Sequence, residues 1–338
     1  MTEEAQSAFE QLRATFKTGK TKTLEWRRNK IKALIRGLEE MAQELSEGVS
    51  KDLGRTHFDA ELGEISLTVE AANHCLAHLE EYMADIPEKT ELLLMPATCV
   101  TRYEPLGVIG VYGSWNFPIA MLVKPVIYAI AAGNCVLAKP SEVSANTSAA
   151  LKKMFDKYMA ESDAQQTVLC IEGGVEVGKY MNNLRLDLIC FTGSTQVGSL
   201  IAQTAAKNLT PCLLELGGKC PVVVDEGSDV AFTAKKIAAT KLMGCGQICI
   251  NADYMLVKES LLDEFVQGVR QAWTDMLGDQ PEESPDYSRI INEFHTERIE
   301  RLINTAGGEI VCGGNVNKEK KYVAPTIILS PNQDAEIM

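Results

Sequence analysis

The chain has 338 residues, which is enough for two domains. Hydrophobic residues make up 46% of it and charged residues 23%, a composition typical of a folded protein rather than a disordered one. Its 33 Lys and Arg stand against 46 Asp and Glu, and the net charge of −13 argues against nucleic-acid binding, because it repels phosphate backbones. The N-terminus is amphipathic and acidic, unlike a secretory signal, and the ten cysteines form no CxxC pair. These features predict reduced thiols and a cytoplasmic protein.

The first quarter of the chain is predicted to be helical. Apolar residues recur at spacings of three and four over residues 26–45, and a second helical pattern covers 65–83. Pro87 ends this pattern, and the following segment looks extended. His74 and His78 lie four apart on one predicted helix, but Cys, not the Glu of a metalloprotease helix, follows the first of them. We therefore predict no metal site.

From residue 105 onward, short apolar runs alternate with helical patterns. This rhythm predicts βαβ units and a mostly parallel sheet, whose strands are apolar throughout because helices cover both faces. The most apolar region, 105–138, is divided by Lys124, so no membrane span is expected. Ligands of such sheets bind at the carboxyl ends of the strands. The expected strands are PLGVIGVYG, NCVLAKP, TVLCIEGG, LDLICFTG and PCLLELGG.

A second set of elements begins near Gly217. A helix is expected over 229–243, and the strand YMLVKE and two further helices follow it. The run YVAPTIIL is predicted as the last strand.

Two segments after predicted strands could bind a nucleotide. FTGSTQVG joins a strand to the start of a helix, where backbone N–H groups bind phosphate, although an ordinary Ser or Thr helix cap would look the same. AKPSE places Lys139 and Glu142 where they could hold the hydroxyls of a sugar. A simple salt bridge between these two side chains is the alternative.

Glu215 and Asn116 are candidates for catalytic work. Glu215 lies in the apolar run LELGG, and burial would make its carboxylate easier to protonate near neutral pH, as a general base requires. The alternative is a buried glutamate that holds backbone amides. Asn116, in GSWNFP, could donate its amide to an oxyanion or could be a plain turn residue.

Cys245 and Cys249 lie four apart in GCGQICI. They could form a disulfide, share a metal, pack in a core, or supply a nucleophile and a bystander. A reactive cysteine needs access and a lowered pKa, and the glycines beside it would let a reactant approach closely. The absence of a nearby histidine argues against papain-like chemistry.

Taken in order, five of these segments resemble the aldehyde dehydrogenase superfamily, most closely the class 3 branch that acts on fatty and aromatic aldehydes. The resemblance implies an α/β fold, in which a Rossmann-like parallel-sheet cofactor domain is followed by an α/β catalytic domain. It is carried by PLGVIGVYGSWNFP, AIAAGNCVLAKPSE, FTGSTQVG, LELGGKCP and GQICINADY.

The resemblance also implies a division of the chain. Residues 1–88 and 105–215 would form the NAD(P)-binding domain, 89–104 an extended oligomerisation segment, and 216–338 the catalytic domain. No Glu-x-Phe-Gly-Pro motif, whose glutamate holds the nicotinamide ribose in this family, occurs in the sequence. The catalytic domain is therefore predicted to be incomplete at its C-terminus, where some relatives carry a membrane anchor.

The roles that the resemblance implies are specific. Cys249 would be the nucleophile and Cys245 a bystander, or a thiol able to trap Cys249 under oxidation. The side chain of Asn116 and the backbone N–H of Cys249 would stabilise the oxyanion, and Glu215 would activate water. NAD or NADP would contact Lys139, Glu142, Gly193, Ser194, Thr195, Gly198 and Trp115.

The implied reaction is the oxidation of aldehydes to carboxylic acids through a cysteine thiohemiacetal and a thioester. Medium- or long-chain aliphatic and aromatic aldehydes would be the substrates, and a homodimer the assembly. A catalytically silent cofactor-binding or structural homologue is the main alternative. An enzyme that passes the acyl group to coenzyme A is disfavoured by Glu215.

Overall fold

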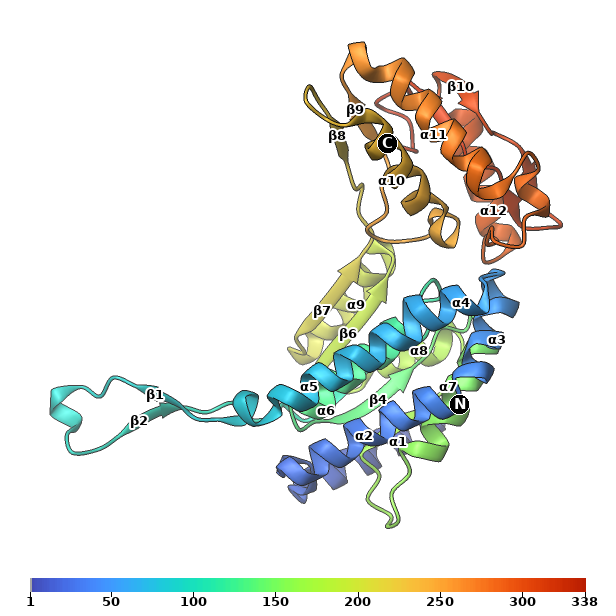
Figure 1. Cartoon of the computed structure of the whole chain (residues 1–338). Coiled ribbons are helices and arrows are strands. Elements are labelled where there is room, and N and C mark those ends of the chain that lie inside the picture. The colour runs from blue at the N-terminus through green and yellow to red at the C-terminus, as the bar shows by residue number, and fades with distance from the viewer. Residues whose placement is uncertain (1) are drawn as a thin grey trace. The chain divides into compact units, whose positions relative to one another are not determined.

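The computed structural model describes residues 2–338, which form two compact units (Figure 1). The first unit contains residues up to 48 together with 60–215, and the second contains 49–59 and 216–338. Residues 49–59 thus group with the second unit, whereas the expected division placed them in the cofactor domain. Within residues 2–338, no helix combines the length and the apolar character needed to cross a membrane.

A five-stranded sheet organises the first unit, and it confirms the predicted α/β fold. Its strand order is β5-β4-β3-β6-β7, and the pairs β5/β4, β4/β3 and β3/β6 are parallel. The chain begins in the middle at β3, builds outward through β4 and β5, then crosses to β6 and β7. The strands are β3 (Val108–Tyr112), β4 (Cys135–Lys139), β5 (Val168–Cys170), β6 (Leu188–Gly193) and β7 (Cys212–Leu216).

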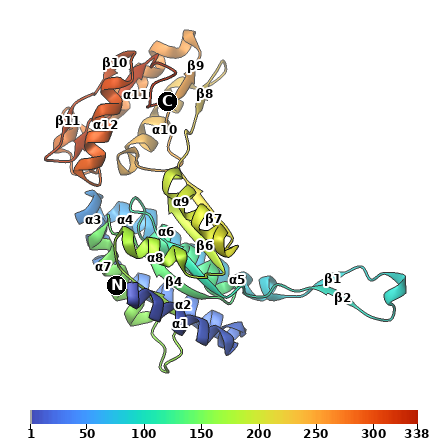
Figure 2. The ribbon, with the colours of Figure 1, turned by 180° about the vertical axis from the view of Figure 1, so that it is seen from behind.

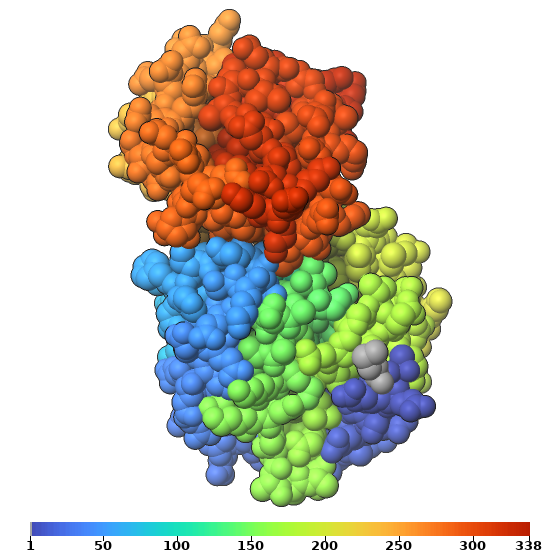
Figure 3. All heavy atoms as spheres, turned by 90° about the vertical axis from the view of Figure 1, so that its right-hand side faces the viewer, coloured from blue at the N-terminus to red at the C-terminus, as the bar shows by residue number. Residues whose placement is uncertain are grey.

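Helices cover both faces of this sheet, which explains why β3 and β4 are buried along their whole length. On one face, α1, α8 and α9 bury Leu12, Met181 and Ile201 against Val108 and Leu137. On the other, α6 and α7 pack with α2 and α5, and the atoms of α2 and α7 meet in Figure 3. The helices of this unit are α1 (Thr2–Lys17), α2 (Leu24–Glu40), α5 (Leu67–Met83), α6 (Ala120–Ala131), α7 (Ala145–Tyr158), α8 (Val175–Asn183) and α9 (Thr195–Ala205), while α3 (Ala42–Leu53) and α4 (His57–Ala60) span the boundary between the units.

An antiparallel hairpin projects from the first unit (Figure 2). Its strands are β1 (Ile86–Glu88) and β2 (Cys99–Thr101), and the short 3₁₀ helix η3 (Leu92–Leu94) lies near its tip. The tip exposes four consecutive apolar side chains: Leu92, Leu93, Leu94 and Met95.

The second unit is built around the helix pair α10 and α11. Gly268 allows their close approach, because a Cβ there would lie 2.8 Å from the Cβ of Ala234. The parallel strands β8 and β9 pack on this pair. The elements are β8 (Val222–Val224), α10 (Val230–Leu242), β9 (Met255–Val257), α11 (Leu262–Leu277), α12 (Glu293–Thr305), β10 (Glu309–Cys312), β11 (Val316–Asn317), β12 (Tyr322–Val323) and β13 (Ile327–Leu329).

The prediction of one final strand over YVAPTIIL is wrong. β12 pairs with β11, and β13 pairs with β10, so the run is divided between two small antiparallel sheets. Pro325 lies between the two strands and has no N–H to continue a ladder.

Candidate active site

Three candidate segments of the first unit leave the same edge of the sheet. Tyr112, at the end of β3, pairs with Lys139 on β4 and with Phe191 on β6, so these strands end nearly level. The chain crosses from one half of the sheet to the other between β3 and β6, and α/β sheets bind ligands at such a switch point. The structure therefore brings together the segments 113–116, 139–142 and 193–195.

The start of α9 is both capped and accessible. The Ser194 hydroxyl accepts a hydrogen bond from the N–H of Val197 at 3.3 Å, so the ordinary helix cap considered from the sequence is present. Ser194 and Thr195 are exposed, Gly198 is buried, and the first turn carries no acidic side chain. Gly193 leaves room for a neighbour, because a Cβ there would lie 2.4 Å from the ring of Phe191, which would have to shift. An anion can still approach this positive helix end.

Lys139 and Glu142 form the salt bridge that was the alternative to sugar binding. The Lys139 ammonium donates to Oε2 of Glu142 at 2.7 Å and to the carbonyl oxygen of Pro140 at 3.3 Å. Lys139 is buried, whereas Glu142 is exposed at the sheet edge. The carboxylate is thus held in place and remains reachable by a hydroxyl donor.

The amide of Asn116 is oriented by a neighbour. The Ser114 hydroxyl donates to Oδ1 of Asn116 at 2.7 Å, which assigns the oxygen to that side and the N–H donors to the other. Asn116 and Trp115 are half-buried in the loop between β3 and α6. Such an arrangement suits a donor to a developing negative charge.

Glu64 anchors the end of this loop, and the sequence did not single it out. It is fully buried in the π-helical turn η2 (Glu61–Ser66), and its Oε2 accepts from the N–H groups of Ile119 and Ala120 at 2.8 and 3.1 Å. These donors begin α6 and would otherwise lack helical partners. An acidic residue in a helical stretch gives no sign of this contact, because its partners lie 55 residues further along the chain.

We expect Glu64→Ala to lower the free energy of unfolding by about 2–4 kcal/mol, because it strips two buried N–H groups of their acceptor. Glu64→Gln keeps an acceptor oxygen and should cost less. Urea unfolding followed by circular dichroism measures both, with the exposed Glu61 of the same turn as the control. Equal stability of Glu61→Ala and Glu64→Ala would contradict the anchoring role.

Glu215 is exposed, and the expectation that it is buried is wrong. β7 is an edge strand of the sheet, and its side chains alternate between half-buried and exposed, with Glu215 on the exposed side. The run CLLEL looks uniformly apolar around one carboxylate, but only its place at the edge decides which side faces the core. Desolvation therefore gives no support to a general-base role for Glu215. The role is supported instead by the access of water to this exposed side chain.

Cys245 and Cys249 belong to the second unit and have different surroundings. Cys245 packs beside Tyr287 and Tyr322, and its thiol donates to the carbonyl oxygen of Ser288. Burial raises the pKa of Cys245 to about 12, so this thiol stays protonated at neutral pH. Cys249 is exposed. Both are free cysteines, so the disulfide alternative is not seen.

The glycines around Cys245 have a conformational role. Three consecutive residues of the 3₁₀ turn η5 (Met243–Gly246) have left-handed backbone conformations. The φ values are +55° for Gly244, +56° for Cys245 and +75° for Gly246. Glycine adopts this conformation without a steric penalty. The sequence suggested instead that these glycines admit a reactant.

Hydrogen bonds hold the loop that carries Cys249 on both sides of this residue. Gln247 accepts from the N–H of Ile291 at 3.0 Å and donates to the carbonyl oxygens of Gly244 and Arg289 at 2.9 and 3.0 Å. The Lys241 ammonium donates to the carbonyl oxygen of Ala252 at 2.9 Å. Cys249 is therefore exposed on a loop with a fixed path.

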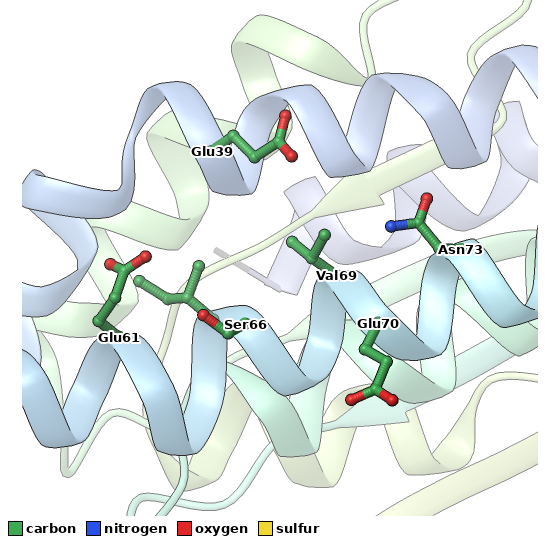
Figure 4. A pocket seen from close by; sticks show the side chains of 7 residues that line it. Glu39, Glu61, Ser66, Val69, Glu70 and Asn73 are labelled. Atoms are coloured by element: carbon green, nitrogen blue, oxygen red, sulfur yellow. The ribbon is translucent and has the colours of Figure 1, made fainter.

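A hollow of about 380 Å³ lies in the first unit between α2 and the η2–α5 helix (Figure 4). It contains none of the residues that the motifs predicted, so it is separate from the candidate site. Among residues 2–338, no group of three or more His, Cys, Asp or Glu could hold a metal ion. The residues that line the hollow are Glu39, Glu61, Ile65, Ser66, Val69, Glu70 and Asn73.

Comparison with known proteins gives consistent matches over the whole chain. A model of the aldehyde dehydrogenase family matches residues 1–338. Aldehyde dehydrogenase family 3 member B3 of Mus musculus is 34% identical over 337 residues, which cover 100% of this chain and 69% of that protein. Aldehyde dehydrogenase family 3 member A2 of Rattus norvegicus is 35% identical over 329 residues, covering 97% and 67%.

A solved structure gives the same result. The substrate-bound state of a Staphylococcus aureus AldH superposes with a TM-score of 0.93 at 32% identity, over 98% of this chain and 72% of that one. The chain thus spans about 70% of the length of these relatives. The full-length family match, together with the sheet and its ordered motifs, shows that the chain belongs to the aldehyde dehydrogenase family.

Proposed function

We propose that the chain carries the residues for NAD(P)-dependent oxidation of aldehydes to carboxylic acids, with Cys249 as the nucleophile. The observation that carries this proposal is the contrast between the two cysteines of the GCGQICI loop. Cys249 is exposed on a loop whose path is fixed by hydrogen bonds, whereas Cys245 is half-buried and its raised pKa keeps the thiol protonated. The similarity to aldehyde dehydrogenase family 3 members supports the proposal, because the sequence motifs resembled the same branch of the family.

The first unit has features that fit a dinucleotide. The exposed start of α9, free of acidic side chains in its first turn, would hold the pyrophosphate. Lys139 and Glu142 would hold the adenosine ribose, and Trp115 would lie near the cofactor. NAD or NADP, when bound, supplies the acceptor for the hydride that leaves the substrate carbon.

The protein groups supply the remaining steps. The Cys249 thiolate adds to the aldehyde carbon, and the amide of Asn116 and the backbone N–H of Cys249 donate to the oxyanion. Loss of hydride from the thiohemiacetal leaves a thioester on Cys249. Glu215 takes a proton from water, which attacks the thioester, releases the carboxylic acid and restores the thiolate.

The test is formation of reduced cofactor by the purified chain with NAD or NADP and an aldehyde. A medium-chain aliphatic and an aromatic aldehyde should both be oxidised, with one acid formed for each reduced cofactor. Cofactor binding without acid formation would favour the silent homologue instead. An acyl-coenzyme A product, formed only when coenzyme A is added, would refute the role of Glu215.

We further propose that the hairpin of β1 and β2 joins two copies of the chain. The segment 89–104 presents Leu92 and Leu93 with exposed fractions of 86% and 96%, which is unfavourable in water. We expect Leu92→Asp with Leu93→Asp to convert a dimer to a monomer in sedimentation experiments. A wild-type chain that is monomeric at the same concentration would contradict this role.

A further inference from the structure

A third cysteine lies beside the loop that carries Cys249. Cys220 follows Gly-Gly-Lys in the segment that leads into β8, and its thiol lies 3.3 Å from the carbonyl oxygen of Cys249, to which it donates. Cys220 is half-buried and Cys249 is exposed, so both thiols are partly accessible. Neither the motifs nor the proposed reaction gives Cys220 a task.

Backbone hydrogen bonds hold the two segments side by side. The N–H of Asp253 donates to the carbonyl oxygen of Cys220 at 3.0 Å, and the N–H of Val222 donates to that of Tyr254 at 3.0 Å. An ion pair between Lys219 and Asp253 links the same segments. The position of Cys220 next to the Cys249 loop is therefore set by the start of the β8/β9 ladder, not by a mobile side chain.

The separation is within reach of a disulfide. A carbonyl oxygen lies about 2.4 Å from the Cα of its own residue, so the Cys220 sulfur is at most about 5.7 Å from the Cα of Cys249. Rotation of the two exposed or half-exposed side chains, with a small movement of the loop, can bring the sulfurs to bonding distance.

Cys245 is a poorer partner for Cys249. Its thiol is turned toward Ser288 and Tyr287, and burial raises its pKa to about 12. The resemblance implied that Cys245 is either a bystander or a thiol able to trap Cys249 under oxidation; the surroundings of the three thiols favour Cys220 for the second role.

We propose that Cys220 is the resolving thiol for Cys249 when a hydroperoxide oxidises the protein. The Cys249 thiolate attacks the outer oxygen of the hydroperoxide, giving a sulfenic acid and releasing an alcohol or water. The Cys220 thiol then attacks the sulfenic sulfur, so that a disulfide forms and water leaves. Thiol–disulfide exchange with a small dithiol restores both thiols. The inference deepens the proposed function, since the disulfide would shield the nucleophile from irreversible oxidation.

The experiment treats the reduced full chain with a small excess of hydrogen peroxide, blocks free thiols with N-ethylmaleimide, and maps the peptides without reduction. Before the thiols are blocked, we expect the intact mass to fall by two hydrogens; after blocking, the peptides that contain Cys220 and Cys249 should be joined. A dithiol should reverse both changes. A disulfide between Cys249 and Cys245, or none at all, would overturn the proposal.

Two variants sharpen the result. In Cys220→Ser, Cys249 should gain two or three oxygens that a dithiol does not remove, whereas Cys245→Ser should form the same disulfide as the wild type. If Cys220→Ser regains its reduced mass as fully as the wild type, Cys220 is not the resolving thiol. The mass readout is independent of turnover, so a chain that forms the disulfide but oxidises no aldehyde would refute the proposed function alone.

Discussion

Cys249→Ala is expected to abolish acylation of the protein by an activated ester, whereas Cys245→Ala is expected to leave it intact. The reason is the difference in surroundings: Cys249 is exposed, whereas Cys245 is half-buried, donates to the carbonyl oxygen of Ser288 and has a pKa raised to about 12. Intact mass spectrometry measures the acyl adduct directly. Because this reaction needs no cofactor, it tests the nucleophile separately from NAD(P) binding.

With cofactor and aldehyde, the same substitution should lower the rate of reduced-cofactor formation by about 10⁴-fold or more, since no covalent intermediate can form. Cys245→Ala should cost about 1 kcal/mol of the free energy of unfolding through a small cavity, with little effect on rate. Equal losses of acylation in the two variants, at matched folded fractions, would show that the nucleophile has been assigned to the wrong cysteine.

Glu215→Gln is expected to have the second large effect, a slower hydrolysis of the thioester once Cys249 has been acylated. Without a carboxylate to take the proton from water, we expect hydrolysis of the thioester to slow by about 10²–10⁴-fold. The acyl adduct on Cys249 should then accumulate, and reduced cofactor should appear as a single burst. The decay of the adduct, followed by mass spectrometry after excess ester is removed, measures the step.

The exposure of Glu215 makes this variant informative. A side chain on the exposed side of an edge strand contributes little to folding, so Glu215→Gln should unfold at the wild-type temperature. Glu176→Gln, another exposed carboxylate of the first unit, is the matched control and should deacylate normally. An adduct that decays equally fast in Glu215→Gln and wild type would remove Glu215 from the mechanism.

Much of the first unit could be predicted from local patterns. Short apolar runs that alternate with helical periods identified the parallel sheet, and helices on both faces explain why β3 and β4 are apolar throughout. The same reasoning predicted that the candidate segments follow strand ends, and the level ends of β3, β4 and β6 confirm that they share an edge.

Patterns failed where burial depends on position in the sheet or on distant partners. Glu215 was expected inside, because a run such as CLLEL does not reveal that β7 is an edge strand. Glu64 was missed because its partners, the N–H groups that begin α6, lie far along the chain. Cys220 was passed over for the same reason, since only the β8/β9 ladder brings it to Cys249.

The sequence by itself determined the kinds of residue available, their order along the chain, and the alternation of strands and helices, because these depend on local spacing and composition. Only the tertiary structure decided which of two cysteines four residues apart is exposed, which carboxylate is buried, and which third thiol lies beside Cys249. Exposure, pKa and proximity are set by neighbours that are distant in sequence, and folding alone brings those neighbours together.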